Sequence, residues 1–119
     1  MDLATDETGL VLDVPYHDGQ LQGLRVEPAS CTLGFLDIEG RSWLIELRGV
    51  RLLQMFALSQ GTTIASIQVV DGDALSDGRL ALLGDNRAYG RWVFLLHVSY
   101  GADVVADCED VAIRLERTT

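Results

Sequence analysis

Short apolar runs separated by glycine, aspartate and proline follow one another along most of this chain. Residues 21–27 alternate between apolar and charged side chains and end at Pro28, which cannot donate a hydrogen bond to a sheet. Residues 31–38 and 42–50 flank the tripeptide Glu39-Gly40-Arg41, so they predict a compact hairpin. The first half of the chain is therefore expected to form three consecutive strands.

The hairpin and the segments after it divide into inward-facing and outward-facing positions. In residues 42–50 the alternation places Trp43, Ile45 and Leu47 inward. Residues 62–70 are rich in β-branched side chains and predict a strand with Ile67 and Val69 in the core.

The last third of the chain contains its most apolar segment, residues 91–100, which is expected to be a central strand covered on both faces. Residues 108–117 alternate again and predict a closing strand. Residues 52–58 fit either a strand end with a loop or one or two helical turns, and 79–83 fit a short strand at best. Residues 101–107 are expected to turn.

This pattern predicts one all-β domain over residues 1–119. About seven or more short strands with hairpin-length links favour an antiparallel β-sandwich or a flattened barrel with little helix, in which strands follow one another as a meander. Residues 1–14 mix acidic and turn-forming types and are expected to be frayed. A chain of this length is sufficient for a single core.

Charge narrows the range of partners. The chain has 18 Asp and Glu against 9 basic residues, a formal net charge of −9, which repels nucleic acid and anionic membranes and favours a basic protein partner. Every basic residue is an arginine, so Schiff-base chemistry is excluded. No apolar stretch approaches the roughly 20 residues of a membrane helix, and residues 1–13 lack the features of a secretory signal, so we expect a cytoplasmic protein.

The first candidate site is the pair His17-Asp18, because an imidazole oriented by a carboxylate can act as a base or a ligand. The same residues lie next to Gly19, where turn chemistry explains them equally well. His97 interrupts the most apolar segment. A buried polar pair with Asp18 or Glu46 would account for it.

Acidic residues form a second candidate surface. Asp71, Asp73 and Asp77 lie in a middle loop, and Asp107 and Asp110 lie near the C-terminus together with Asp103 and Glu109. If the fold brings these groups together, they form a face that attracts a basic partner; solubility alone is the alternative. The middle loop fails as an EF-hand because leucines stand at two of its ligand positions.

Catalytic and metal-binding motifs are missing from the sequence. Two histidines without zinc-type spacing predict no metal site, and no nucleophile motif, phosphate loop or dinucleotide fingerprint is present. We therefore predict no cofactor and no catalytic residue. Cys31 and Cys108 are expected to be buried, reduced thiols.

Three segments carry a resemblance to a known group of proteins. These are His17-Asp18-Gly19 with Leu21 and Gly23-Leu24 after it, Ile45-Glu46-Leu47-Arg48-Gly49-Val50, and Gly61-Thr62-Thr63-Ile64. They resemble small bacterial β-proteins, some of which are similar to immunity proteins of polymorphic toxin systems. The resemblance implies a cytoplasmic protein that binds and blocks a toxin.

Three hypotheses for function follow. The first is a non-catalytic protein-binding module. The second is a small-ligand-binding protein or enzyme that uses His17 and Asp18 in a pocket of the β core. The third is a self-associating structural subunit, suggested by the apolar residues on both faces of residues 93–98.

Overall fold

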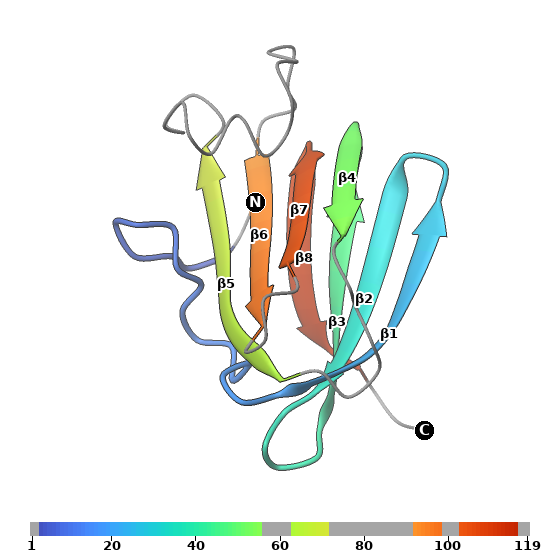
Figure 1. The fold of residues 1–119 in the computed structure, drawn as a ribbon. Helices are drawn as coiled ribbons and strands as arrows, with labels where there is room; N and C mark the ends of the chain where they lie inside the picture. The colour runs from blue at the N-terminus through green and yellow to red at the C-terminus, as the bar shows by residue number, and fades with distance from the viewer. Residues whose placement is uncertain (1–2, 56–62, 72–91, 99–102, 117–119) are drawn as a thin grey trace.

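The computed structural model describes residues 3–55, 63–71, 92–98 and 103–116, which form two four-stranded antiparallel sheets (Figure 1). The first sheet has the order β1-β2-β3-β8 and the second the order β4-β7-β6-β5. The strands are β1 Gln20–Glu27, β2 Ser30–Leu36, β3 Ser42–Arg48, β4 Leu52–Met55, β5 Ile64–Asp71, β6 Trp92–Val98, β7 Asp103–Cys108 and β8 Asp110–Leu115.

The two sheets confirm the predicted all-β class, and their arrangement is a flattened sandwich. No helix occurs among the described residues. The expected meander is wrong, because the chain passes from the first sheet to the second after β3 and returns after β7. The two connections between the sheets are in contact, at Gly49 after β3 and Glu109 after β7. Gly49 has a φ of +64°, and a Cβ at this position would lie 2.6 Å from Cγ of Glu109, so the close approach requires glycine.

The first sheet contains the predicted hairpin, β2–β3, and a second one, β1–β2. β1 pairs with β2 through the two-residue turn Pro28-Ala29, and β2 pairs with β3. Ile45 and Leu47 are fully buried, and Trp43 packs against the core, as the alternation predicts. β8 adds to the far side of β3 from the end of the chain.

The second sheet contains the expected central strand. β6 lies between β5 and β7, and it is buried on both faces, with Phe94 and Leu96 on the core side and Val93 and Leu95 on the other. The turn expected over 101–107 is wrong from Asp103 onwards, since that segment is strand β7. Val104, Val105 and Ala106 are all buried there, so no polar-apolar alternation marks the strand.

The N-terminal arm, residues 3–19, is ordered from Leu3 onwards, contrary to the expected fraying. It lies along the open edge of β5, where Val11 N–H donates to Ile67 O and Val69 N–H donates to Gly9 O. Val11 and Tyr16 are buried in the core. Burial of these apolar side chains holds the arm against the core, although its acidic composition predicts a frayed segment.

Two apolar clusters result from this arrangement. The main core lies between the sheets and includes Phe35, Ile45, Ile67 and Phe94 among its fully buried members. A smaller cluster of Val93, Leu95 and Val105, with Val70 packed against it, lies on the outer face of the second sheet.

Some predictions fall on other parts of the chain. The short strand expected at 79–83 and the second half of the segment 52–58 lie outside the described residues. The first half of that segment is strand β4. Among the residues that the structure describes, no helix is long and apolar enough to cross a membrane.

Candidate functional site

The turn between β2 and β3 is held by one buried carboxylate. Asp37 Oδ1 accepts hydrogen bonds from the backbone N–H groups of Glu39 and Arg41, each at 2.9 Å. Its Oδ2 accepts from Arg41 Nε and from Trp43 Nε1, also at 2.9 Å each. Gly40 supplies the left-handed residue that the turn requires, with a φ of +80°. The five-residue tip is therefore fixed from within.

The hydrogen bonds of this turn stabilise the negative charge of Asp37. Burial by itself raises the pKa of the Asp37 carboxyl, but the hydrogen bonds from Trp43, Arg41 and Glu39 outweigh burial and lower the pKa to about 2. The carboxylate is thus ionised at any physiological pH. The ring of Trp43 stacks on Phe35 with centroids 6.2 Å apart, which connects the turn to the core.

Ile38 stands at the tip of this fixed turn with 75% of its surface exposed, the largest exposure among the large apolar residues described. Its neighbours Glu39 and Arg41 form an exposed ion pair at 3.1 Å. The hydrogen bonds of the turn use other residues, so local structure does not account for an isoleucine here. A polar residue is the usual occupant of such a position.

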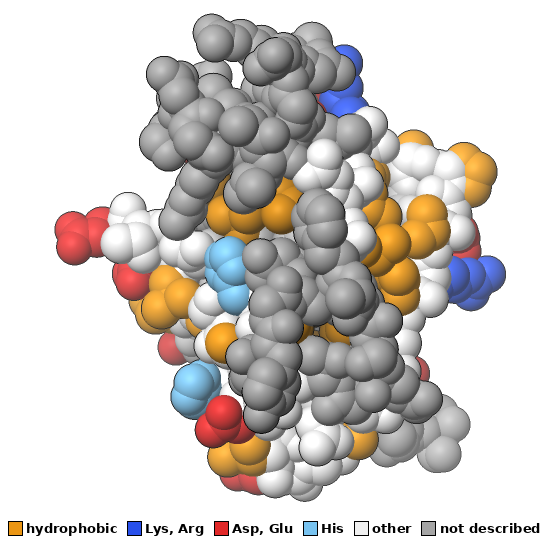
Figure 2. Space-filling view, in the orientation of Figure 1, with side chains coloured by type: hydrophobic (Ala, Val, Ile, Leu, Met, Phe, Trp, Pro, Cys, Tyr) orange, Lys and Arg blue, Asp and Glu red, His pale blue; other side chains and the backbone are white. Residues whose placement is uncertain are grey.

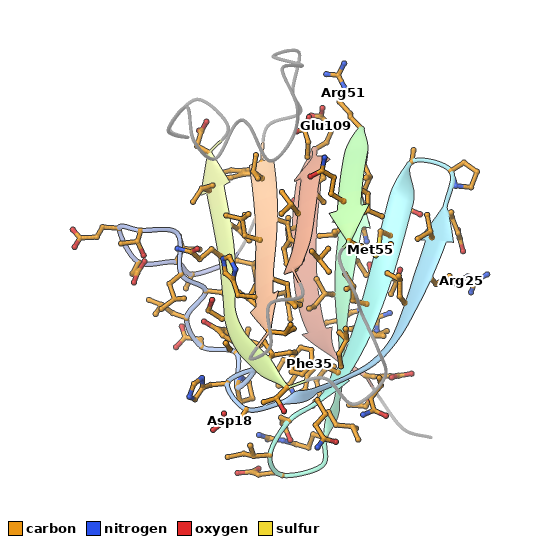
Figure 3. The ribbon with its side chains drawn as sticks, in the orientation of Figure 1. Asp18, Arg25, Phe35, Arg51, Met55 and Glu109 are labelled. Carbon is orange, nitrogen blue, oxygen red and sulfur yellow. The ribbon has the colours of Figure 1, made fainter. Side chains whose placement is uncertain are left out.

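His17 and Asp18 form a turn at the same end of the molecule. Gln20 pairs with Leu36, so residues before Gln20 and after Leu36 extend beyond the β1–β2 pair in the same direction. Asp18 has a φ of +61° and its N–H donates to Ile64 O. Figure 3 shows Asp18 at the lower end of the structure, near the β2–β3 turn.

The side chains of this pair are exposed. His17 Nδ1 lies 3.2 Å from Ala65 O, which fits a donated hydrogen bond, and its Nε2 lies 3.8 Å from Asp18 Oδ2. The two side chains are 76% and 68% exposed. Residues 17, 18, 38, 39 and 41 together are called the hairpin-end surface below. This surface combines one apolar side chain with two acidic groups, one basic group and an imidazole.

The predicted acidic residues take different positions. Asp71 pairs with Trp92, and Trp92 pairs with Cys108, so Asp71 lies at the same end of the second sheet as the turn at Glu109. This is the end opposite the hairpin-end surface, where Figure 3 shows Glu109 and Arg51. Asp73 and Asp77 lie outside the described residues.

Asp107 and Asp110 differ in exposure. Asp107 is buried beside the outer apolar cluster, so it does not contribute to an acidic surface as expected, because it faces Val93 across β6 and β7. Asp110 is half-buried opposite Arg48. Burial, then the charges of Asp107, Asp110 and Glu109, raise the pKa of Cys108 to about 12. These three carboxylates therefore lie near one another around the β7–β8 turn, with Arg48 opposite Asp110.

The remaining candidate residues are the two cysteines and His97, which occupy buried or half-buried positions in the sheets. Cys31 and Cys108 are buried free thiols, as predicted. His97 is half-buried in β6, while Glu46 is engaged by Arg114 and Arg48 on the first sheet. No group of three or more His, Cys, Asp or Glu side chains that could hold a metal occurs in the described part of the chain.

Sequence reasoning missed Asp37 and Ile38. The signal for Asp37 was present, because aspartate three residues before glycine is typical of a turn that the carboxylate caps. Ile38 was counted as the end of a strand. Its exposure follows from the turn starting two residues earlier than the apolar run suggests.

Comparisons with known proteins add little to this description. No protein-family model matches the chain, and no curated protein matches its sequence. A crystal structure of an uncharacterized protein from Neisseria gonorrhoeae is similar with a TM-score of 0.44 and 14% sequence identity, over 83% of this chain and 92% of that chain.

Proposed function

We propose that this protein is a non-catalytic protein-binding module and that its hairpin-end surface contacts the partner. The observation that carries the proposal is Ile38, which is 75% exposed on a turn held by four hydrogen bonds to the buried Asp37. An exposed apolar side chain on a fixed turn resembles the anchor residues that dominate many interfaces.

The fixed turn favours binding for an entropic reason. Ordering a flexible loop on association costs free energy, and a turn that is already ordered avoids that cost. Asp37, Gly40 and the stacked Trp43 order this turn in the free protein. Burial of Ile38 in an apolar pocket of the partner would then be largely net gain.

Charge indicates the type of partner. The hairpin-end surface carries Asp18 and Glu39 against Arg41, and the whole chain carries a net charge of −9. A basic protein with an apolar pocket complements both features. Inhibition of a basic toxin, which the resemblance to immunity proteins implies, is the form of binding that we favour.

The test begins with capture of partners on immobilised protein from the native host at low salt. The captured protein is then purified and titrated against wild type and Ile38→Asp. Loss of a central anchor is expected to weaken binding by roughly 30-fold or more. Raising the salt concentration should also weaken binding, because the attraction between charges is screened.

The matched control is Val26→Asp, which places the same new charge at an exposed apolar position near the other end of β1. Residues 20 and 26 are about 20 Å apart along the strand. The proposal requires that Ile38→Asp abolishes capture and that Val26→Asp retains it. Equal capture by both variants would show that the hairpin-end surface is not the binding site.

A further inference from the structure

The outer side of β1 has almost no pairing partner among the residues that the structure describes. Apart from Gln20, which bridges to Thr63, no described residue pairs with the outer side of this strand. The ladder to β2 shifts register between Leu21 and Gly23 and is regular from Leu24 to Glu27. In Figure 1, β1 is the outermost strand on the right.

The inward-facing side chains of this edge are exposed and apolar. Leu24 pairs with Leu33, and Val26 pairs with Cys31, so all four share the inner face of the sheet. Leu33 and Cys31 are buried, whereas Leu24 is 40% exposed and Val26 is 58% exposed. On the inner face of the sheet, side chains are therefore buried at β2 but exposed at β1. Hydrophobic side chains are visible at the surface on this side in Figure 2.

The edge at β5 is paired, and part of the edge strand β8 is covered. The N-terminal arm bonds to β5 through Gly9 and Val11. On β8, Val111 is buried and Ile113 is half-buried. Proteins usually protect exposed edges with inward-pointing charges or by covering them. Residues 24–27 carry no inward-pointing charge, because Arg25 and Glu27 lie on the outer face, and no described residue covers the outer side of these four residues.

We propose that a second copy of this chain pairs with β1, antiparallel and about a two-fold axis at Val26. Glu27 and Ser30 face each other across a two-residue turn, which makes them a hydrogen-bonded pair. The backbone N–H and C=O groups of Leu24 and Val26 therefore point away from β2. In the dimer, Val26 exchanges two hydrogen bonds with Val26 of the second copy.

Charge selects this register. Arg25 and Glu27 lie on the outer face of β1 and contact each other at 2.7 Å. With the axis at Val26, Arg25 lies opposite Glu27 of the second copy, in a non-hydrogen-bonded pair where side chains approach most closely. The four groups alternate in sign. An axis at Arg25 would instead place the two arginines opposite each other.

The apolar side chains give the same register. Val26 meets Val26 of the second copy on the inner face, and Leu24 lies opposite Pro28. Pro28 has no N–H, so the ladder ends there. The pairing is short, and a weak dimer is expected. This inference does not depend on the proposed function, since the hairpin-end surface lies near the other end of β1.

The first test is sedimentation of the whole chain at concentrations up to about 1 mM, the range for weak association. Wild type should show a concentration-dependent dimer, and Val26→Asp should raise its dissociation constant about tenfold or more. Ile38→Asp should leave dimerisation unchanged. A wild type that remains monomeric throughout would overturn the inference.

Charge exchange tests the register itself. Arg25→Glu and Glu27→Arg each place like charges opposite one another in their own dimers, so each alone should dimerise about tenfold more weakly. A mixture of the two variants should restore association, because each strand then faces its complement. A mixture no tighter than its components would show that Arg25 and Glu27 do not meet across the axis.

Cross-linking tests the position of the axis. The Cβ atoms of directly opposite residues are about 5 Å apart in an antiparallel pair, close enough for Val26→Cys to form an intermolecular disulfide on oxidation. Ile38→Cys is the matched control and should form no intermolecular disulfide. Dimers that form equally with both variants would contradict the proposed axis.

Discussion

The outer faces of the two sheets differ sharply in what lies on them. On the first sheet the outer face carries polar and charged side chains, among them Glu46, which is bound by Arg114 at 2.7 Å and by Arg48 at 3.0 Å. On the second sheet the corresponding face carries Val93 and Leu95, both buried. The first sheet is thus covered on one face and the second on both.

This difference determines the pattern of apolar and polar residues in each strand. A strand with one wet face alternates between apolar and polar residues, as β3 does. A strand covered on both faces, such as β6 or β7, has no alternation. The same difference implies that apolar contacts stabilise the outer face of the second sheet, whereas salt affects the outer face of the first more strongly.

The largest expected effect is a truncation on the covered face. Leu95→Ala should lower the free energy of unfolding by about 2–5 kcal/mol, because the removed atoms leave a cavity. Leu44→Ala, on the wet face of the first sheet, should cost about 1 kcal/mol. Denaturant titration of both variants measures the two losses. Equal losses would remove the distinction between the faces.

The second prediction concerns acid and the β2–β3 turn. The pKa of Asp37 is lowered from 3.8 to about 2 in the folded state, so its stabilisation is present above pH 3.8 and is lost as pH falls through 2. Asp37→Asn should lower the Tm at neutral pH, because its amide would face the donors of Arg41 and Trp43. Between pH 4 and pH 2 the variant should lose less stability than wild type. Thermal melts over this range provide the measurement, and parallel pH profiles would refute this role of Asp37.

The third prediction concerns alkali and the second sheet. The pKa of Cys108 is raised from 9.0 to about 12 in the folded state, so the unfolded thiol ionises first and stability falls above pH 9. Between pH 8 and pH 10 this should amount to about 1 kcal/mol. Burial also raises the pKa of Cys31, without neighbouring carboxylates. Cys108→Ala should therefore reduce the alkaline loss of stability, measured by urea titration, more than Cys31→Ala does.

The smallest effect is expected on the charged face. Hydrogen bonds from Arg114 and Arg48 lower the pKa of Glu46. Glu46→Gln should cost about 0.5 kcal/mol at low salt, and less at high salt, because surface ion pairs are screened. Urea titration at two salt concentrations measures the change. A cost that is independent of salt would mean that packing, rather than charge, matters at this position.

Several elements could be predicted from the sequence because their cause is local. The alternation of residues 42–48 and the glycine at position 40 specify a hairpin without reference to the rest of the chain. The strand at 92–98 was predicted from its apolar length. In each case the neighbours along the chain determine the structure.

Other elements depend on distant contacts. The strand β7 follows Gly101-Ala102 and contains only three consecutive apolar residues, and it is a strand because β4 and β6 pair with both of its sides. The order of the N-terminal arm depends on β5 in the same way. The candidate site was predicted only in part. His17 and Asp18 were identified from the sequence, but the exposure of Ile38 could not be predicted without knowing where the turn begins.

The pairing of β3 with β8 affects how the protein is made. Trp43 lies beside Leu115, so the first sheet receives its fourth strand from a segment that is far along the chain from the other three. Until residues 110–115 have been synthesised and are free to fold, β1, β2 and β3 can form hairpins, but β3 keeps an open edge with apolar side chains. Completion of this sheet must therefore wait for residues 110–115, and the pairing of distant segments makes that step slow.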